Sequence, residues 1–167
     1  MGATKQQLET QLSELNKAWN AEKLTIVKNI DIGLEPVQDY TEFGGRVTQY
    51  FIADDIYDVS AIRAVHNIAQ TSADGAALQV AKATSTTAPS IGSDAACLIT
   101  DGNGGTNIFR GFDLKGIAAH VVTNCTLTTA TATLRLAVGD RLVYGCNGTL
   151  SSTVITLITT LTRVRTP

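Results

Sequence analysis

The sequence predicts a mainly β protein: an antiparallel β-sandwich of jelly-roll type, preceded by an N-terminal α-helix. Three observations indicate this. From about residue 45 onward, short runs of β-forming residues alternate with turns that contain Gly, Asn or Asp. Charged residues make up only 17% and aromatic residues 5% of the 167 residues, and threonine and alanine are abundant, as in strands with small side chains. The first 30 residues instead follow a helical period.

The helix is predicted over about residues 4–28, within an association or anchor segment at 1–30, with Thr4 as its N-cap. Its apolar residues recur in the pattern of a heptad seam, which Glu22 interrupts. A helix this short is marginal alone, so it either folds back onto its own domain or associates with a partner. We favour association, because a narrow stripe suits a partner helix. The candidate association residues are Leu8, Leu12, Leu15, Trp19 and Ile26.

Residues 31–44 are predicted to be a linker, and they begin an acidic stretch. Residues 31–74 contain eight carboxylates against two arginines, whereas residues 75–167 carry more bases than acids. Such an asymmetry either pairs complementary patches of neighbouring subunits or forms a solvated surface.

The β-sandwich domain is predicted over residues 45–167. Its last strand has apolar residues on both faces, so it is expected to be central in its sheet or to lie at a subunit interface. Turns are expected at Lys115-Gly116, Val138-Gly139-Asp140 and Asn147-Gly148, and a long loop at 84–96. The expected strands are 47–53, 61–69, 77–83, 108–114, 120–127, 133–136, 140–146 and 153–164.

The pattern of reactive residues argues against an enzyme. His66 and His120 lie far apart in the sequence and outside any nucleophile–base motif. Asp101-Gly102-Asn103-Gly104-Gly105 resembles half of a calcium loop, but a turn with glycines at positive φ explains it better. We therefore predict no catalytic, cofactor-binding or metal-binding residues and no cofactor. Three further carboxylates fit an exposed loop as well as a cation site: Asp54, Asp55 and Asp58.

The spacing of the cysteines indicates the state of their thiols, and the net charge and the lengths of the apolar runs bear on the expected partners. Cys97, Cys125 and Cys146 show no CxxC spacing, so buried thiols in a reducing cytosol are expected, with a Cys125–Cys146 bridge as the alternative. A net charge of -2 argues against a general nucleic-acid binder. No apolar run reaches the ~18 residues of a membrane span, so neither nucleic acid nor membrane is an expected partner.

One succession of motifs in the C-terminal half has a counterpart in a known class of proteins. It consists of GFDLKG at 111–116, TLTTATATLRLAVGDRL at 126–142, the Asn147-Gly148-Thr149 turn and the Thr/Val-rich strand at 153–165. This succession resembles tailed-bacteriophage virion proteins of the capsid decoration, cement or head-fibre class. The resemblance covers about residues 45–167, and the Gly139-Asp140 turn is also similar to that of trimeric jelly rolls of the complement and tumour-necrosis-factor class.

The resemblance implies a virion structural protein that decorates or cements the capsid surface and is made in the host cytoplasm. It implies a homo-oligomer, a trimer, whose other partners are the major capsid protein or other virion proteins. The acidic stretch at 31–58 is then the expected contact with the capsid lattice. A receptor- or glycan-binding module of a tail fibre or spike is the alternative, and it predicts exposed aromatic side chains on loop tips.

Overall fold

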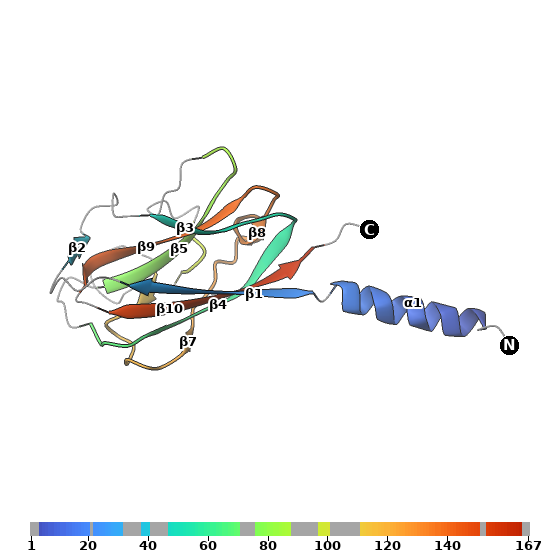
Figure 1. Ribbon diagram of the computed structural model, residues 1–167, viewed down its shortest axis with the longest axis horizontal. Helices are drawn as coiled ribbons and strands as arrows, with labels where there is room; N and C mark the ends of the chain where they lie inside the picture. The colour runs from blue at the N-terminus through green and yellow to red at the C-terminus, as the bar shows by residue number, and fades with distance from the viewer. Residues whose placement is uncertain are drawn as a thin grey trace.

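Two antiparallel β-sheets form the body of the molecule, and a helix projects from one end (Figure 1). This confirms the predicted fold class. The computed structural model describes residues 4–20, 22–31, 38–40, 47–70, 76–87, 97–100, 111–150 and 153–164. Its elements are α1 (Lys5–Asn20), β1 (Lys23–Asp31), β2 (Gln38–Tyr40), β3 (Thr48–Ile52), β4 (Tyr57–His66), β5 (Ala76–Ala83), β6 (Phe112–Asp113), β7 (Thr123–Asn124), α2 (Thr131–Leu134), β8 (Arg135–Leu136), β9 (Arg141–Leu150) and β10 (Val154–Arg163).

Each sheet has five strands within the described residues. Sheet A has the order β1-β10-β4-β7, and β8 also pairs with β4. Sheet B has the order β2-β9-β5-β6, and β3 also pairs with β9. The pairing is antiparallel throughout. The predicted last strand, β10, is central in sheet A, as its two apolar faces led us to expect.

The core lies between the two sheets and follows the period of two along each strand. On β4, Ile62, Ala64 and His66 point inward and are at most 1% exposed, and they alternate with residues that point outward. Apolar burial of this kind is the main favourable term in folding. The largest fully buried side chains come from both sheets and from the segments between them: Phe112, Ile62, Leu78, Leu98, Ile99, Leu114, Leu136, Leu142, Ile155, Leu157 and Leu161.

The turn that leads into β9 is built as predicted. Gly139 has a φ of +85°, a conformation that costs glycine little. The Asp140 N–H donates to the carbonyl of Ala137 at 3.0 Å, and the Asp140 carboxylate accepts from the Ala137 N–H at 2.9 Å. The Gly139 N–H donates to the carbonyl of Ala53 at 2.7 Å, which fixes the turn against the segment after β3.

The N-terminal helix is shorter than predicted, because β1 replaces its last part. α1 ends at Asn20, and β1 pairs with β10 from Lys23↔Thr162 to Asp31↔Val154. Ile26 is therefore a strand residue, half-buried against the core. The segment Leu24–Ile30 fits a period of two as well as a helical one, and a full ladder of backbone pairs outweighs helix propensity. Sheet A thus includes residues 23–30 of the predicted association segment 1–30 and residue 31 of the predicted linker.

Several smaller expectations are also corrected. Asn147-Gly148 is not a hairpin turn: it lies inside β9, where Gly148 pairs with Ala76 on one side and Tyr40 on the other. β9 continues through this Asn-Gly sequence because it is paired with a strand on each of its two edges. Residues 131–134 form α2, a single helical turn, so that the strand predicted at 133–136 is reduced to β8. The strand predicted at 120–127 is reduced to β7, and β2 lies within the predicted linker 31–44.

Candidate association site

The helix α1 begins at the residue that the sequence predicts. The Gln7 backbone N–H donates to the Thr4 hydroxyl at 3.3 Å, and the Thr4 N–H donates to the Gln7 side-chain oxygen at 2.9 Å. This reciprocal pair is a capping box, which satisfies two donors at the start of the helix. Lys5 and Glu9 form an ion pair one turn apart at 3.8 Å, a weak but favourable contact on the helix surface.

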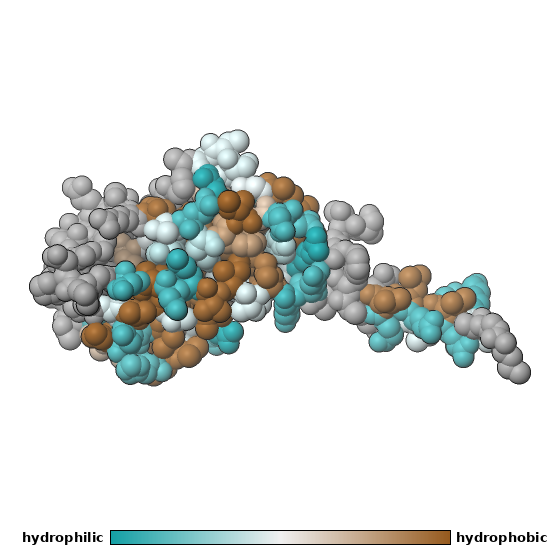
Figure 2. Space-filling model, viewed as in Figure 1, coloured by the Kyte–Doolittle hydropathy of each residue, from teal (hydrophilic) through white to brown (hydrophobic). Residues whose placement is uncertain are grey.

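Three of the five predicted association residues gather on one exposed face of α1. Leu8, Leu12 and Leu15 recur at helical spacing and are 56%, 60% and 66% exposed. Figure 2 shows hydrophobic residues along the projecting helix, away from the β-sandwich. Trp19 lies in α1, but its side chain is outside the described part of the chain. Ile26 packs in β1 and does not extend this leucine stripe.

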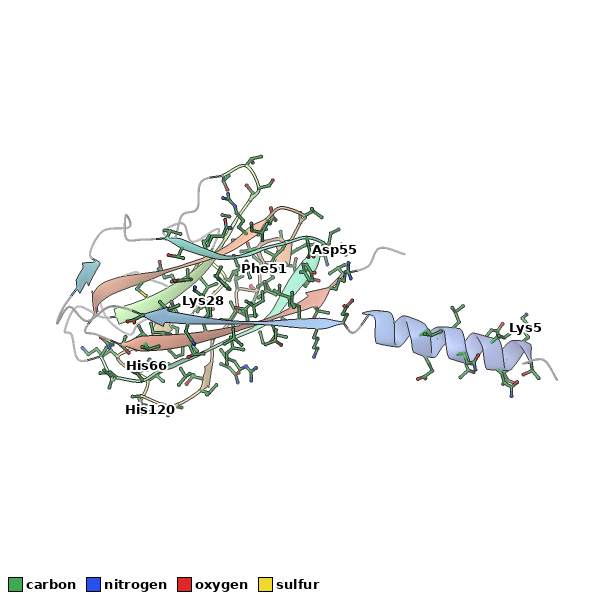
Figure 3. All side chains as sticks on the ribbon, in the orientation of Figure 1. Lys5, Lys28, Phe51, Asp55, His66 and His120 are labelled. Carbon is green, nitrogen blue, oxygen red and sulfur yellow. The ribbon has the colours of Figure 1, made fainter. Side chains whose placement is uncertain are left out.

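A cluster of charged residues ties the base of α1 to the β-sandwich. The Arg163 backbone N–H donates to the carbonyl of Glu22 at 3.1 Å. The Arg163 guanidinium donates to the carboxylate of Asp55 and, at 3.3 Å, to that of Glu22. Both carboxylates raise the pKa of Arg163, Asp55 more than Glu22. Figure 3 places Asp55 at the end of the sandwich from which α1 projects. This clamp, formed by Glu22, Asp55 and Arg163, has no sequence motif and was not predicted.

The carboxylates of the candidate cation cluster are engaged by different protein groups. Asp54 accepts a hydrogen bond from the Tyr57 hydroxyl at 2.8 Å, and Asp55 belongs to the clamp. Asp58 accepts two hydrogen bonds from Arg135, both at 2.9 Å. Among the described residues, no three His, Cys, Asp or Glu side chains are grouped so that they could hold a metal ion. The loop at 101–105 lies outside the described residues.

The fold brings the two histidines together, which their sequence separation did not predict. The His120 backbone N–H donates to the carbonyl of His66 at 2.7 Å, and both residues lie toward the end of the sandwich away from α1 (Figure 3). His66 is 1% exposed, its ring meets that of Phe112 edge-on at 6.2 Å, and neither ring nitrogen is hydrogen-bonded. Burial lowers the pKa of His66 below its ordinary value.

The cysteines and aromatic residues are built into the body of the protein. Cys97, Cys125 and Cys146 are buried thiols, as the first of the two cysteine expectations states, and burial raises the pKa of Cys146 to about 12. Wherever a Tyr or Phe side chain is described, it is buried or partly buried: Tyr50, Phe51, Tyr57, Phe112 and Tyr144. Among the described residues, no helix combines the length and hydropathy needed to cross a bilayer.

Comparisons with known proteins give structural likenesses to viral capsids. No protein-family model matches the sequence, and no curated protein matches it. The solved capsid of Ralstonia phage GP4 contains a similar chain, at 15% identity and a TM-score of 0.45, with 86% of each chain covered. The VP2 subviral particle of infectious bursal disease virus is similar at 12% identity and a TM-score of 0.29, over 85% of this chain and 38% of the other. At these identities and TM-scores, the likeness does not identify the function of this chain.

Proposed function

We propose that this chain is a phage virion structural protein that decorates or reinforces the capsid surface as a homo-oligomer, a trimer in the class that it resembles. The observation that carries the proposal is the leucine stripe on α1. Leu8, Leu12 and Leu15 are more than half exposed on a helix that projects from a body with its own core. Exposed apolar residues that line up on one face mark an interaction site, and a narrow stripe suits partner helices.

The exposed leucines contribute a favourable burial term to association. Full burial of a leucine side chain contributes about 1.5–3 kcal/mol. Since each leucine is already about 40% buried in the single chain, association gains roughly 1–2 kcal/mol per leucine. Three leucines therefore contribute roughly 3–6 kcal/mol per protomer, before the entropy cost of association is subtracted. Many copies on one capsid then reinforce weak individual contacts through avidity.

The clamp at the base of α1 supports the same role. It holds the carbonyl and the carboxylate of Glu22, directly before β1, against Arg163 of β10. The residue before β1 is therefore held against the sandwich, two residues after the end of α1. The part of the acidic stretch outside the clamp is our proposed contact with the capsid lattice.

The direct test is to mix the protein with capsids that lack it and to measure co-sedimentation. We expect saturable binding of wild type. The Leu12→Asp, Leu15→Asp double variant removes two of the three leucines, so its association is expected to weaken by roughly 2–4 kcal/mol per helix, about 30- to 1,000-fold. The matched control is Thr10→Asp, Ser13→Asp, which adds the same charges to the opposite face of α1.

The proposal has two parts, and the experiment separates them. If wild type does not bind such capsids, the decoration role is wrong. If the Leu12→Asp, Leu15→Asp variant has the same mass in solution and the same capsid binding as the Thr10→Asp, Ser13→Asp control, the role given to α1 is wrong. Circular dichroism of both variants checks that the β-sandwich remains folded.

A further inference from the structure

The outer face of sheet A is a second surface without an assigned role. We define it by the side chains of β1, β10 and β4 that point away from the core. The backbone pairing aligns them in rows across the three strands, such as Val27–Ile158–Arg63 and Asn29–Thr156–Val65. Its members are Lys23, Thr25, Val27, Asn29, Asp31, Val154, Thr156, Ile158, Thr160, Thr162, Asp58, Ala61, Arg63 and Val65.

The chemistry of this face suits burial in a protein interface. In the three central rows of this face, Arg63 is the single charged side chain, and the others are β-branched, small or amide side chains. The charged residues Lys23, Asp31 and Asp58 lie in the rows at its two ends. β-branched side chains are stiff and lose little conformational entropy when they are buried. The Thr156 hydroxyl donates to the Asn29 side-chain oxygen at 2.9 Å, so part of its polar surface is already satisfied within the face. Depletion of charge at the centre is the compositional mark of an interface core.

The outer face of sheet B, unlike that of sheet A, is covered by other parts of the chain. There Ala81, Ala83 and Val143 form a small cluster and are only 0–3% exposed. On sheet A, by contrast, Val27 is 60% and Val154 is 38% exposed. The chain itself therefore buries the apolar centre of the outer face of sheet B, but leaves Val27 and Val154 of sheet A accessible.

The position of β1 identifies the occupant. β1 is the edge strand of sheet A and begins at Lys23, two residues after Ala21 and three after the end of α1. In Figure 1, α1 continues outward from the end of β1, along roughly the same line. Helices that associate along their leucine stripes therefore bring together the β1 strands, which follow the helices directly in the sequence. β1 is also the first strand of the exposed outer face of sheet A.

We infer that the outer face of sheet A packs against neighbouring copies of this chain in the homo-oligomer. The inference rests on the proposed association through α1 and extends it to the β domain. In this arrangement, the copies associate through α1. The interface between their sandwiches is formed by the Val27–Ile158 row and its threonine neighbours.

The test introduces a charge on this face and measures the dissociation constant of the oligomer by sedimentation. Val27→Arg on the full chain is expected to raise that constant at least tenfold. The matched control is Ile52→Arg, which changes an equally exposed apolar residue (55%) on β3 of sheet B and is expected to alter it less than threefold. Thermal melts check that both variants fold.

A second variant, Val27→Cys, tests the same interface without introducing a charge into it. Because the native cysteines are buried thiols, Val27→Cys introduces an exposed one. We expect its alkylation rate to fall at least tenfold as the protein concentration rises through the range in which oligomers form. An unchanged rate, with oligomers present, overturns the inference.

The outcomes for α1 and for sheet A are distinguishable. If Leu12→Asp, Leu15→Asp dissociates the oligomer while Val27→Arg associates as wild type does, the association through α1 stands and the sheet A interface is refuted. If wild type is a monomer at all concentrations tested, the association through α1 fails, and this inference fails with it.

Discussion

Acidification is expected to destabilise the fold through His66. The imidazole is 1% exposed, neither ring nitrogen is hydrogen-bonded, and its ring lies edge-on to Phe112. Burial is the largest influence and lowers the pKa of His66 below 6.5; the backbone of Ile117 opposes this, His120 reinforces it, and Asp113 opposes it. The folded protein therefore holds His66 neutral at a pH where the unfolded chain is already protonated.

The sign and size of the effect follow from proton linkage. Above pH 6.5, both states leave the histidine neutral and the stability does not depend on it. As the pH falls from 6.5 towards the lowered pKa of the folded state, the unfolded chain gains a proton that the folded protein does not. The free energy of unfolding then falls by up to about 1.4 kcal/mol per pH unit. Below the folded pKa, both states are protonated and the loss stops growing.

The assay is urea denaturation at pH 7.5, 6.5 and 5.5 at one protein concentration. Between pH 7.5 and 5.5, we expect wild type to lose more stability than His66→Leu, which has no group to protonate at this position. His120→Gln removes an exposed neighbour whose charge reinforces the lowered pKa of His66, so it is expected to lose less stability than wild type but more than His66→Leu. Equal losses in wild type and His66→Leu would refute the reasoning.

Three further predictions concern packing, the turn before β9 and the thiols. Phe112→Ala is expected to lower the free energy of unfolding by about 3–5 kcal/mol, because Phe112 is completely buried; a loss below 1 kcal/mol in denaturant titration would contradict this. Gly139→Ala should cost about 1–2 kcal/mol, since its φ is +85° and a Cβ would lie 3.1 Å from that of Ser85; an unchanged midpoint would count against it. Cys146 should react with a thiol reagent only after unfolding, because burial raises its pKa to about 12; rapid labelling of the native protein would be inconsistent with that burial.

The sequence predicts best where one local pattern has no competitor. The period-two alternation of Ile62, Ala64 and His66 identifies the buried face of β4, and the Gly139-Asp140 turn follows from the glycine conformation. Local patterns fail where pairing between distant strands decides. Ile26 continues a helical stripe in the sequence, but it lies in β1 because this segment pairs with β10. Asn147-Gly148 is typical of turns, but it is extended because β9 is paired on both edges.

The candidate association site was predicted in part for the same reason. Leu8, Leu12 and Leu15 form a local helical pattern, and the structure leaves them on one exposed face. The clamp joins Glu22 and Arg163, which are 141 residues apart in the sequence, so it cannot be predicted from a local sequence pattern. The outer face of sheet A likewise exists only after three separate strands are aligned, although the apolar character of both faces of β10 already raised the possibility of a subunit interface there.

Sheet A also constrains the order of folding during synthesis. Its edge strand β1 is made near the beginning of the chain, yet its pairing partner β10 is near the end: Asn29 and its partner Thr156 are 127 residues apart. Closing so large a loop is slow and entropically costly, and β1 can pair only after β10 has also been synthesised. The leucine stripe of α1, by contrast, consists of residues close together in the sequence and needs no distant strand to complete its pattern. Pairing of β1 with β10 is therefore a late step in the folding of sheet A.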